Sequence, residues 1–379
     1  MKRIKYFCYY DYNDGRYPRE GVQAASTKID YIVQAINKSG IAVDLISKSG
    51  VSEKGFAFDA GGEIHKGENT LRHFASFGCM GSPLRVLSRW LNTLHFIIWF
   101  LFNVKRNEEI WVYHSLGYCK LMIWLKKIVG FKLIGEIEEI YQDVHQQTAA
   151  TSAAEYKFHT ICDKFVYPNA LLNSICNPLN KPYLVVHGLY YTIPDMGVRF
   201  DDNDVHALYS GTFDPEKGGA QVAIELIEYL PENYHVHITG FGDEKLVAEL
   251  QILAQSVAAK SRAKLSFHGF VSREELNELM QKCHVGLCTQ PPHTKLNETS
   301  FPSKILNYMA NGLVVLCGKN KTITTSAVGD IVSYYESDNM KDIAAAVVLA
   351  AKRDGNECRS RLIQLDKEFT ANLNKFLAK

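Results

Sequence analysis

The sequence predicts an α/β protein made of two doubly wound domains, each with a parallel sheet between layers of helices. In both halves of the chain, short β-rich runs alternate with amphipathic segments, a pattern typical of βα units around a parallel sheet. The length of 379 residues suits two domains of roughly 150 to 200 residues. Hydrophobic residues make up 46% and charged residues 22%, as in ordinary globular proteins.

The predicted elements follow this alternation along the chain. Strands are expected in the first half at 4–9, 42–46, 110–114, 131–136, 165–167 and 183–186, and in the second at 205–210, 235–239, 265–268, 285–288 and 314–317. A helix is expected over 23–39, where apolar residues recur at helical spacing and Gly40 can end it. The Gly-rich, weakly periodic segment 50–69 is predicted to be a mobile loop.

The periodicity breaks at 188–204, where Gly, Pro and an acidic cluster predict a linker. The expected domains are therefore 1–190 and 200–357.

Charge and cysteine usage limit the class of partner and the compartment. The 42 Lys and Arg nearly balance the 41 Asp and Glu, so no nucleic-acid partner is expected. The nine cysteines include no Cys-x-x-Cys pair, which indicates reduced thiols in a cytoplasmic protein. The longest apolar run, 94–102, is too short to span a bilayer, and the first residues are too polar for a signal peptide.

A glycine-containing turn follows the strand predicted at 205–210. The segment GTFDPEKGG leads from this strand into a helix, so its backbone amides and Lys217 could bind an anion. The spacing is not that of a Gly-x-Gly-x-x-Gly fingerprint, which argues against a dinucleotide and for a phosphate or diphosphate. The alternative is an ordinary surface loop.

A second anion site is predicted in NETSFPSKILNYMANGLVVLCG. Ser300 is the expected N-cap, Pro302 fits the first turn, and the free N–H groups of 301–304 would face an anion. Asn307, one turn further, could bind ribose hydroxyls. The alternative is a plain capped core helix.

The order of motifs from Tyr209 to Gly318 (YSGTFDPEKGG, HITGFGDE, LSFHGFVSREEL, HVGLCTQPP, SFPSKILNYMANGLVVL) resembles the nucleotide-binding domain of retaining GT-B glycosyltransferases, the glycosyl transferases group 1. The resemblance implies a GT-B fold, with two Rossmann-like domains facing a cleft. It places the acceptor on 1–190 and the nucleotide sugar on 200–357, with helix 358–379 packing back on the first domain. The first fifty residues also resemble bacterial transferases of polysaccharide assembly.

The resemblance also implies the donor-binding residues, among which Lys217 would contact the diphosphate and 270–276 would form the loop beside the base. The side chains of Ser272 and Glu275 in that loop are predicted to form a capping box. The expected donor contacts are Gly211, Thr212, Lys217, Gly240, Phe270, Glu298, Ser300, Phe301, Pro302, Ser303, Lys304 and Asn307.

Three positions depart from the family pattern. Thr212 stands where many members have an arginine, and Asn307 stands where the second of two glutamates belongs. Thr299 aligns with the first glutamate, with Glu298 one residue earlier. Whether the amide at 307 preserves activity is left open.

The expected acceptor side lies at strand ends of the first domain. Glu136 and Glu138 in GEIEEIYQD, with His114 at the end of IWVYH, are the catalytic candidates, because a carboxylate could stabilise oxocarbenium-like charge. A solvated acidic turn and a backbone-satisfied histidine are the alternatives. Arg16, Arg19 and Gly21 form the expected acceptor or phosphate loop.

The predicted function is transfer of a sugar, with retention, from a nucleotide-diphosphate sugar to a glycan or lipid-linked acceptor. No cofactor or metal is expected. The apolar run LHFIIWFLF, bracketed by Arg85, Arg89, Lys105 and Arg106, could contact lipid headgroups at the inner face of a membrane, or belong to core helices. A nucleotide-sugar epimerase and a non-catalytic nucleotide-sugar-binding protein are the alternatives, and donor sugar, base, acceptor and oligomeric state stay undetermined.

Overall fold

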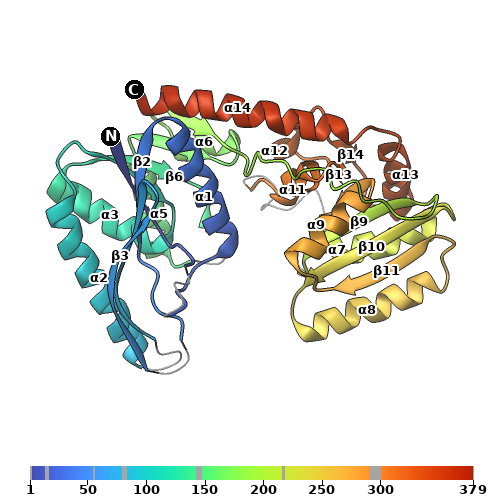
Figure 1. Cartoon of the computed structure of the whole chain (residues 1–379), viewed down its shortest axis with the longest axis horizontal. Coiled ribbons are helices and arrows are strands. Elements are labelled where there is room, and N and C mark those ends of the chain that lie inside the picture. The colour runs from blue at the N-terminus through green and yellow to red at the C-terminus, as the bar shows by residue number, and fades with distance from the viewer. Residues whose placement is uncertain are drawn as a thin grey trace. The chain divides into compact units, whose positions relative to one another are not determined.

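The computed structural model describes residues 2–12, 17–53, 56–78, 83–141, 147–215, 218–290 and 300–378. The chain divides into two units, each with its own parallel sheet (Figure 1). Unit 1 comprises Met1–Val186 with Phe369–Lys379, and unit 2 comprises His187–Glu368. The predicted α/β class, with two Rossmann-like units, is confirmed.

Unit 1 is built on an eight-stranded sheet in the order β3-β4-β2-β1-β5-β6-β7-β8. Neighbouring strands are parallel except β3 and β4. The strands are β1 (Lys2–Cys8), β2 (Ile41–Ser47), β3 (Ala57–Lys66), β4 (Asn69–Gly78), β5 (Glu109–Tyr113), β6 (Lys132–Glu136), β7 (Lys164–Tyr167) and β8 (Tyr183–Val185). The helices are α1 (Gln23–Lys38), α2 (Pro83–Asn103), α3 (Leu116–Val129), α5 (Ala149–Ile161), α6 (Leu171–Cys176) and the end of α14 (Asn356–Ala378).

Unit 2 has six parallel strands in the order β11-β10-β9-β12-β13-β14, which in chain order is the doubly wound order 3-2-1-4-5-6 of dinucleotide-binding folds. The strands are β9 (Val205–Thr212), β10 (Tyr234–Phe241), β11 (Lys264–Gly269), β12 (Val285–Cys288), β13 (Val314–Gly318) and β14 (Ser333–Tyr335). The helices are α7 (Gly219–Glu225), α8 (Glu244–Ala258), α9 (Arg273–Lys282), α11 (Lys304–Ala310), α12 (Lys321–Thr324), α13 (Met340–Ala350) and a 3-10 turn, η1 (Leu226–Tyr229).

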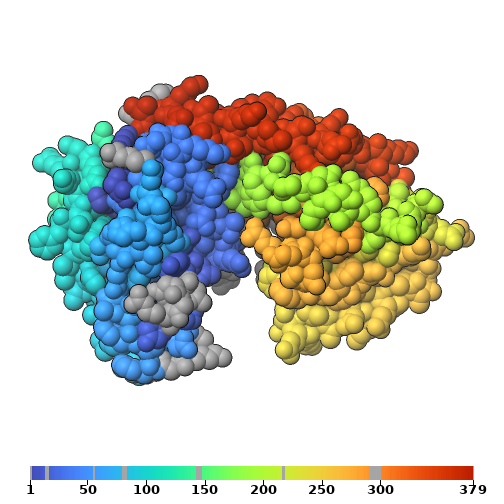
Figure 2. Space-filling model, in the orientation of Figure 1, coloured from blue at the N-terminus to red at the C-terminus, as the bar shows by residue number. Residues whose placement is uncertain are grey.

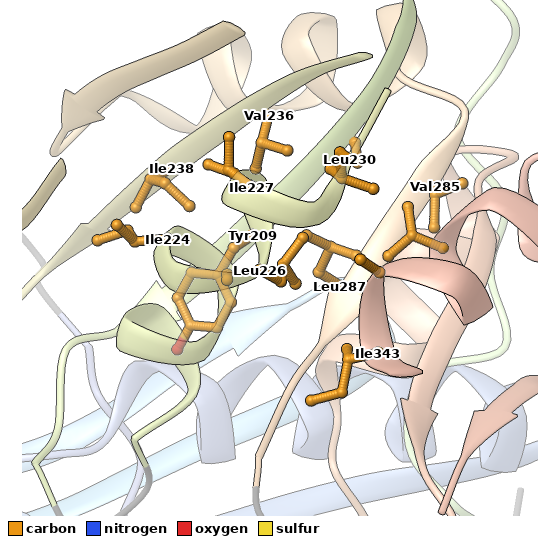
Figure 3. Close-up of a cluster of buried hydrophobic side chains, with 14 of the residues drawn as sticks. Tyr209, Ile224, Leu226, Ile227, Leu230, Val236, Ile238, Val285, Leu287 and Ile343 are labelled. Atoms are coloured by element: carbon orange, nitrogen blue, oxygen red, sulfur yellow. The ribbon is translucent and has the colours of Figure 1, made fainter. Parts of the chain in front are cut away.

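The central strands β12 and β13 of the unit 2 sheet are fully buried and consist of small and aliphatic residues, as parallel strands covered by helices require. Val236 and Ile238 of β10 pack with Leu226 and Ile227 of η1 and with Leu287 of β12 (Figure 3). The strand order changes direction between β9 and β12, so the crevice beyond their carboxyl ends is the expected ligand position.

The eleven strands predicted from sequence are present, each within two residues of its predicted ends. The prediction of a mobile loop at 50–69 is wrong, because β3 pairs antiparallel with β4 over most of this segment. The polar alternation of β3 belongs to an edge strand, which exposes one row of side chains.

The helix predicted from Ser300 begins later than expected. Helix α11 starts at Lys304 and Ser303 holds the N-cap position, without a side-chain cap bond. The predicted N-cap role of Ser300 is therefore wrong. By contrast, the predicted capping box of Ser272 and Glu275 at the start of α9 is confirmed.

Candidate active site

The carboxyl ends of β9 and β10 approach each other too closely for any residue except glycine. A Cβ placed on Gly240 would lie 2.0 Å from the carbonyl oxygen of Gly211, its partner in the β9–β10 register. A Cβ on Gly242 would lie 2.8 Å from the carbonyl oxygen of Phe213. These glycines let the backbone turn tightly at the edge where a phosphate group could approach.

Lys304, the first residue of α11, brings a positive charge to the same edge. A Cβ on Gly211 would lie 2.8 Å from the Lys304 Nζ, and this ammonium lies 4.3 Å from the centroid of the Tyr209 ring. Sequence reasoning considered the backbone amide of Lys304 and missed its side chain. The structure therefore unites Gly211, Gly240 and Lys304 of the predicted donor set.

Tyr308 fixes α11 against this edge. Its hydroxyl accepts a hydrogen bond from the backbone N–H of Ser210 at 2.8 Å, and its ring is fully buried. A Cβ on Gly286 of β12 would lie 2.4 Å from the Tyr308 ring, so a glycine at position 286 leaves the space that this ring occupies. Sequence reasoning missed Tyr308, although its place one turn after Lys304 was a usable signal.

The remaining predicted donor residues surround this edge at different exposures. Phe301 is buried against the His187 ring, with centroids 4.8 Å apart, while Pro302 and Asn307 are half-buried and Ser303 is exposed. Ser300 is half-buried and Thr212 is exposed. Lys217 and Glu298 lie outside the described residues.

Phe270 is 76% exposed and follows β11, and its ring centroid lies 6.3 Å from that of Phe241, which is 56% exposed and ends β10. Two aromatic rings thus extend into solvent beside the carboxyl ends of neighbouring strands. Such rings can stack on a nucleobase.

In unit 1, Glu136 at the end of β6 is fully buried. Its carboxylate accepts hydrogen bonds from the Tyr6 hydroxyl and, at 2.6 Å, from the Trp111 Nε1. Burial, reinforced by the negative charge of Glu138, raises the pKa of Glu136 to about 7. A side chain this deep can hold a proton at neutral pH but does not reach the surface.

Glu138 forms an ion pair with Lys28 of α1, with 2.5 Å between Oε1 and Nζ. The Glu138 side chain is 22% exposed and that of Lys28 is 10% exposed, so the pair lies at the boundary between core and solvent. Lys28 was not predicted from sequence, because a lysine inside an amphipathic helix is normally read as a surface residue.

The structure does not bring His114 to these carboxylates. His114 is 1% exposed, and its ring stacks on Phe158 of α5 at 5.6 Å. Burial lowers its pKa to about 3, with the nearby His159 acting in the same direction. A neutral, enclosed ring is poorly placed for contact with a sugar.

The predicted acceptor loop is held by internal contacts. Arg19 is buried, donates to the carbonyl oxygens of Ser49 and Phe74, and pairs with Asp59. The Arg19 guanidinium therefore stabilises the fold through these internal contacts. Gly21 lies against Asp11, because a Cβ placed on Gly21 would be 2.5 Å from the backbone nitrogen of Asp11. Arg16 lies outside the described residues.

Two side-chain groups among the described residues have the composition of metal ligands, with ligand atoms within 4.8 Å of one another. One is His114, Glu155 and His159, in which the Nε2 of His114 lies 3.5 Å from the Oε1 of Glu155. The other is His206, His235 and His237 at the amino ends of β9 and β10. In the second group the ring nitrogens of His206 and His237 are already hydrogen-bonded.

Each unit is built on its own parallel sheet, and the two units together give the chain the GT-B fold. Residues 197–368, within unit 2, match the model of the family glycosyl transferases group 1. No curated protein matches the sequence.

Solved structures with the same fold cover the whole chain at low identity. Sucrose-phosphate synthase from Thermosynechococcus elongatus superposes with a TM-score of 0.69 at 13% identity, covering 100% of this chain and 98% of that one. A UDP-forming α,α-trehalose-phosphate synthase from Burkholderia xenovorans, in complex with glucose-6-phosphate, gives 0.62 at 10%, covering 100% of both chains. Anabaena HepE in complex with UDP gives 0.62 at 12%, covering 100% of this chain and 98% of that one.

Proposed function

We propose that the protein transfers a sugar, with retention of anomeric configuration, from a nucleoside-diphosphate sugar on unit 2 to a glycan or lipid-linked acceptor on unit 1. The observation that carries the proposal is the group of Gly211, Gly240 and Lys304 at the carboxyl edge of a group 1 domain. Close backbone approach and a fixed ammonium are what a diphosphate needs.

Lys304 compensates for a departure from the family pattern. Many members carry an arginine after the first glycine of this loop, where this chain has Thr212. The Lys304 Nζ lies beside Gly211 and supplies a cation next to that position. It would stabilise the negative charge that develops on the departing diphosphate.

The nucleoside would lie over Phe241 and Phe270, whose exposed rings offer stacking surface, while Asn307 would bind the ribose hydroxyls. An amide can donate to one hydroxyl and accept from another. Uracil is the first base to test, since Anabaena HepE was solved with UDP. The amide at 307 makes weaker hydrogen bonds than the glutamate of the family pattern.

On unit 1, Glu138 is the proposed catalytic residue, and Lys28 is the residue that positions it. The ion pair holds the Glu138 side chain in place, so that its carboxylate can orient an acceptor hydroxyl or stabilise positive charge at the anomeric carbon. Because that charge develops only in the transition state, Glu138→Gln should lower kcat much more than donor affinity.

Calorimetric titration with UDP tests the donor site. We expect Lys304→Met to weaken binding by about 1.5 to 3 kcal/mol, the range for a hydrogen bond to a charged group. Lys264→Met is the matched control, because Lys264 pairs with Asp204 at the opposite edge of the same sheet. Equal UDP affinity in the wild type and Lys304→Met would remove Lys304 from the site.

Product analysis separates the proposed transferase from its alternatives. Incubation with a panel of nucleotide sugars and sugar or lipid-phosphate acceptors should yield a glycosylated product with the donor's anomeric configuration. An isomerised donor formed without acceptor would indicate an epimerase, and binding without turnover would indicate a non-catalytic protein. We also expect EDTA to leave transfer unchanged, because no metal is proposed for the reaction.

A further inference from the structure

The face of α2 opposite the core of unit 1 is apolar and exposed. Ser88, Asn92, Phe96 and Phe100 form its buried face, at a spacing of four residues. Successive residues of a helix are rotated by about 100° around its axis, which places five apolar residues on the opposite face. They are 41% to 71% exposed: Leu87, Trp90, Leu94, Ile98 and Leu101. An amphipathic surface helix normally carries its polar residues on this face.

Helix α3 extends the apolar surface. The two helices are neighbours, since the ring centroids of Phe96 in α2 and Tyr118 in α3 lie 6.0 Å apart. Trp124 and Ile128 of α3 are 46% and 54% exposed, and Phe102 near the end of α2 is 86% exposed. We define the lipid face as these three residues together with the five outward residues of α2; both helices form part of the outer surface of unit 1 (Figure 2).

The charges around the lipid face are mostly positive. Segments 69–107 and 110–135 contain no Asp or Glu. The cations on and beside the two helices are Arg85, Arg89, Lys105, Arg106, Lys120, Lys126 and Lys127. Glu108 and Glu109 lie between these segments, Arg85 pairs with Glu20, and Lys126 pairs with Asp163. The remaining excess of cations is complementary to anionic headgroups.

We propose that the lipid face docks unit 1 on the surface of an anionic bilayer, with α2 lying in the headgroup region. In the described part of the chain, no helix is long and apolar enough to cross a membrane. Apolar side chains with Trp at the interface and a basic rim are the features of a helix that lies in the membrane plane. This goes beyond the proposed transfer reaction and holds whichever acceptor is used.

Vesicle flotation of the full chain tests the proposal. We expect the protein to float with vesicles of equal parts phosphatidylcholine and phosphatidylglycerol, less with phosphatidylcholine alone, and less as salt is raised. Trp90→Ser with Leu94→Ser should reduce the bound fraction on anionic vesicles by roughly tenfold or more, because both side chains lose apolar area to bury. Ile252→Ser is the control, since Ile252 of unit 2 is 66% exposed and outside the lipid face.

Folding and donor binding are monitored separately. The double variant changes exposed residues, so its melting temperature and UDP affinity should match those of the wild type. The proposal is overturned if the wild type floats with neither vesicle, or if the double variant floats as well as the wild type. A wild-type dimer in solution that the double variant loses, without vesicle binding, would assign the surface to a second copy of the chain.

Discussion

At the scale of single residues, Glu136 is the group whose environment most changes its chemistry. Its fully buried carboxylate accepts hydrogen bonds from Tyr6 and Trp111 on one oxygen, while its Oε1 has no hydrogen-bond partner among the described residues. Its pKa is raised from 4.5 to about 7, first by burial and then by Glu138. Between these two values the folded protein therefore binds more protons than the unfolded chain.

Stability should consequently fall as pH rises through this window. The stabilising effect of the protonated Glu136 is fully present below pH 4.5 and lost above about pH 7, a change on the order of 3 kcal/mol. Glu136→Gln mimics the protonated form, so it should match the wild type at pH 5 and be more stable by about 1 to 3 kcal/mol at pH 8. Urea unfolding at both pH values measures the difference. A variant less stable than the wild type at pH 8 would contradict the assignment.

At the scale of elements, three neighbouring strands of unit 2 are joined by a chain of imidazoles. His206 of β9 bonds to Asp202 at 2.8 Å and to His237 of β10 at 2.9 Å, and His237 bonds to His268 of β11 at 3.0 Å. The ring of Phe200 stacks on His237, with centroids 5.0 Å apart. This arrangement is satisfied when the rings share protons along the chain and His237 is neutral.

The histidine chain should make unit 2 sensitive to acid. Burial lowers the pKa of His237 to about 2, with the neighbouring histidines acting in the same direction. Below pH 6.5 the unfolded chain therefore binds a proton at this residue that the folded state does not bind. As the pH is lowered further, the free energy of unfolding falls by about 1.4 kcal/mol per pH unit. Between about pH 4 and 6, His237→Gln should therefore reduce the slope of the unfolding free energy against pH by about 1.4 kcal/mol per pH unit, which corresponds to one bound proton.

The exposed His65 offers the control, with a side chain 76% exposed. His65→Gln should keep the wild-type slope. An unchanged slope in His237→Gln would mean that His237 is not the group that resists protonation.

Elements differed in how far sequence predicted them, and the reason is physical. Central parallel strands such as β9 and β12 are buried on both faces, so they appear as continuous apolar runs. Edge strand β3 alternates polar side chains and contains Gly61 and Gly62, which suggested a loop. Phe301, which precedes α11, packs on the His187 ring. The start of α11 therefore depends on a tertiary contact, which a local capping pattern in the sequence does not predict.

At the scale of the whole molecule, the order of motifs predicted the carboxyl edge of unit 2 better than the candidate site of unit 1. The order of glycines and strands places Gly211, Gly240 and Lys304 on one sheet edge, because carboxyl ends of parallel strands lie together. By contrast, the burial of His114 and the pairing of Glu138 with Lys28 depend on which helices cover the sheet of unit 1. Those contacts join residues more than 40 positions apart, a separation that local patterns do not encode.

The last helix connects the chain's end to its beginning. The final residues of α14, from Phe369, belong to unit 1, where Phe369 stacks on Tyr31 at 5.6 Å. Phe376 is buried beside Trp111, and its carbonyl oxygen accepts a hydrogen bond from Lys164 at 3.0 Å. Residues distant in sequence thus complete the core of unit 1.

Phe376→Ala should therefore destabilise unit 1 by about 3 to 5 kcal/mol, the range for removing a buried aromatic ring. Because each unit has its own hydrophobic core, we expect two unfolding transitions by calorimetry. Phe376→Ala should lower one of them, and UDP, bound to folded unit 2, should raise the other. Ile363→Ala, at a position 47% exposed on the same helix, should change neither by more than about 0.5 kcal/mol. If Phe376→Ala and UDP instead shifted one common transition, the two units would fold as a single cooperative body through α14.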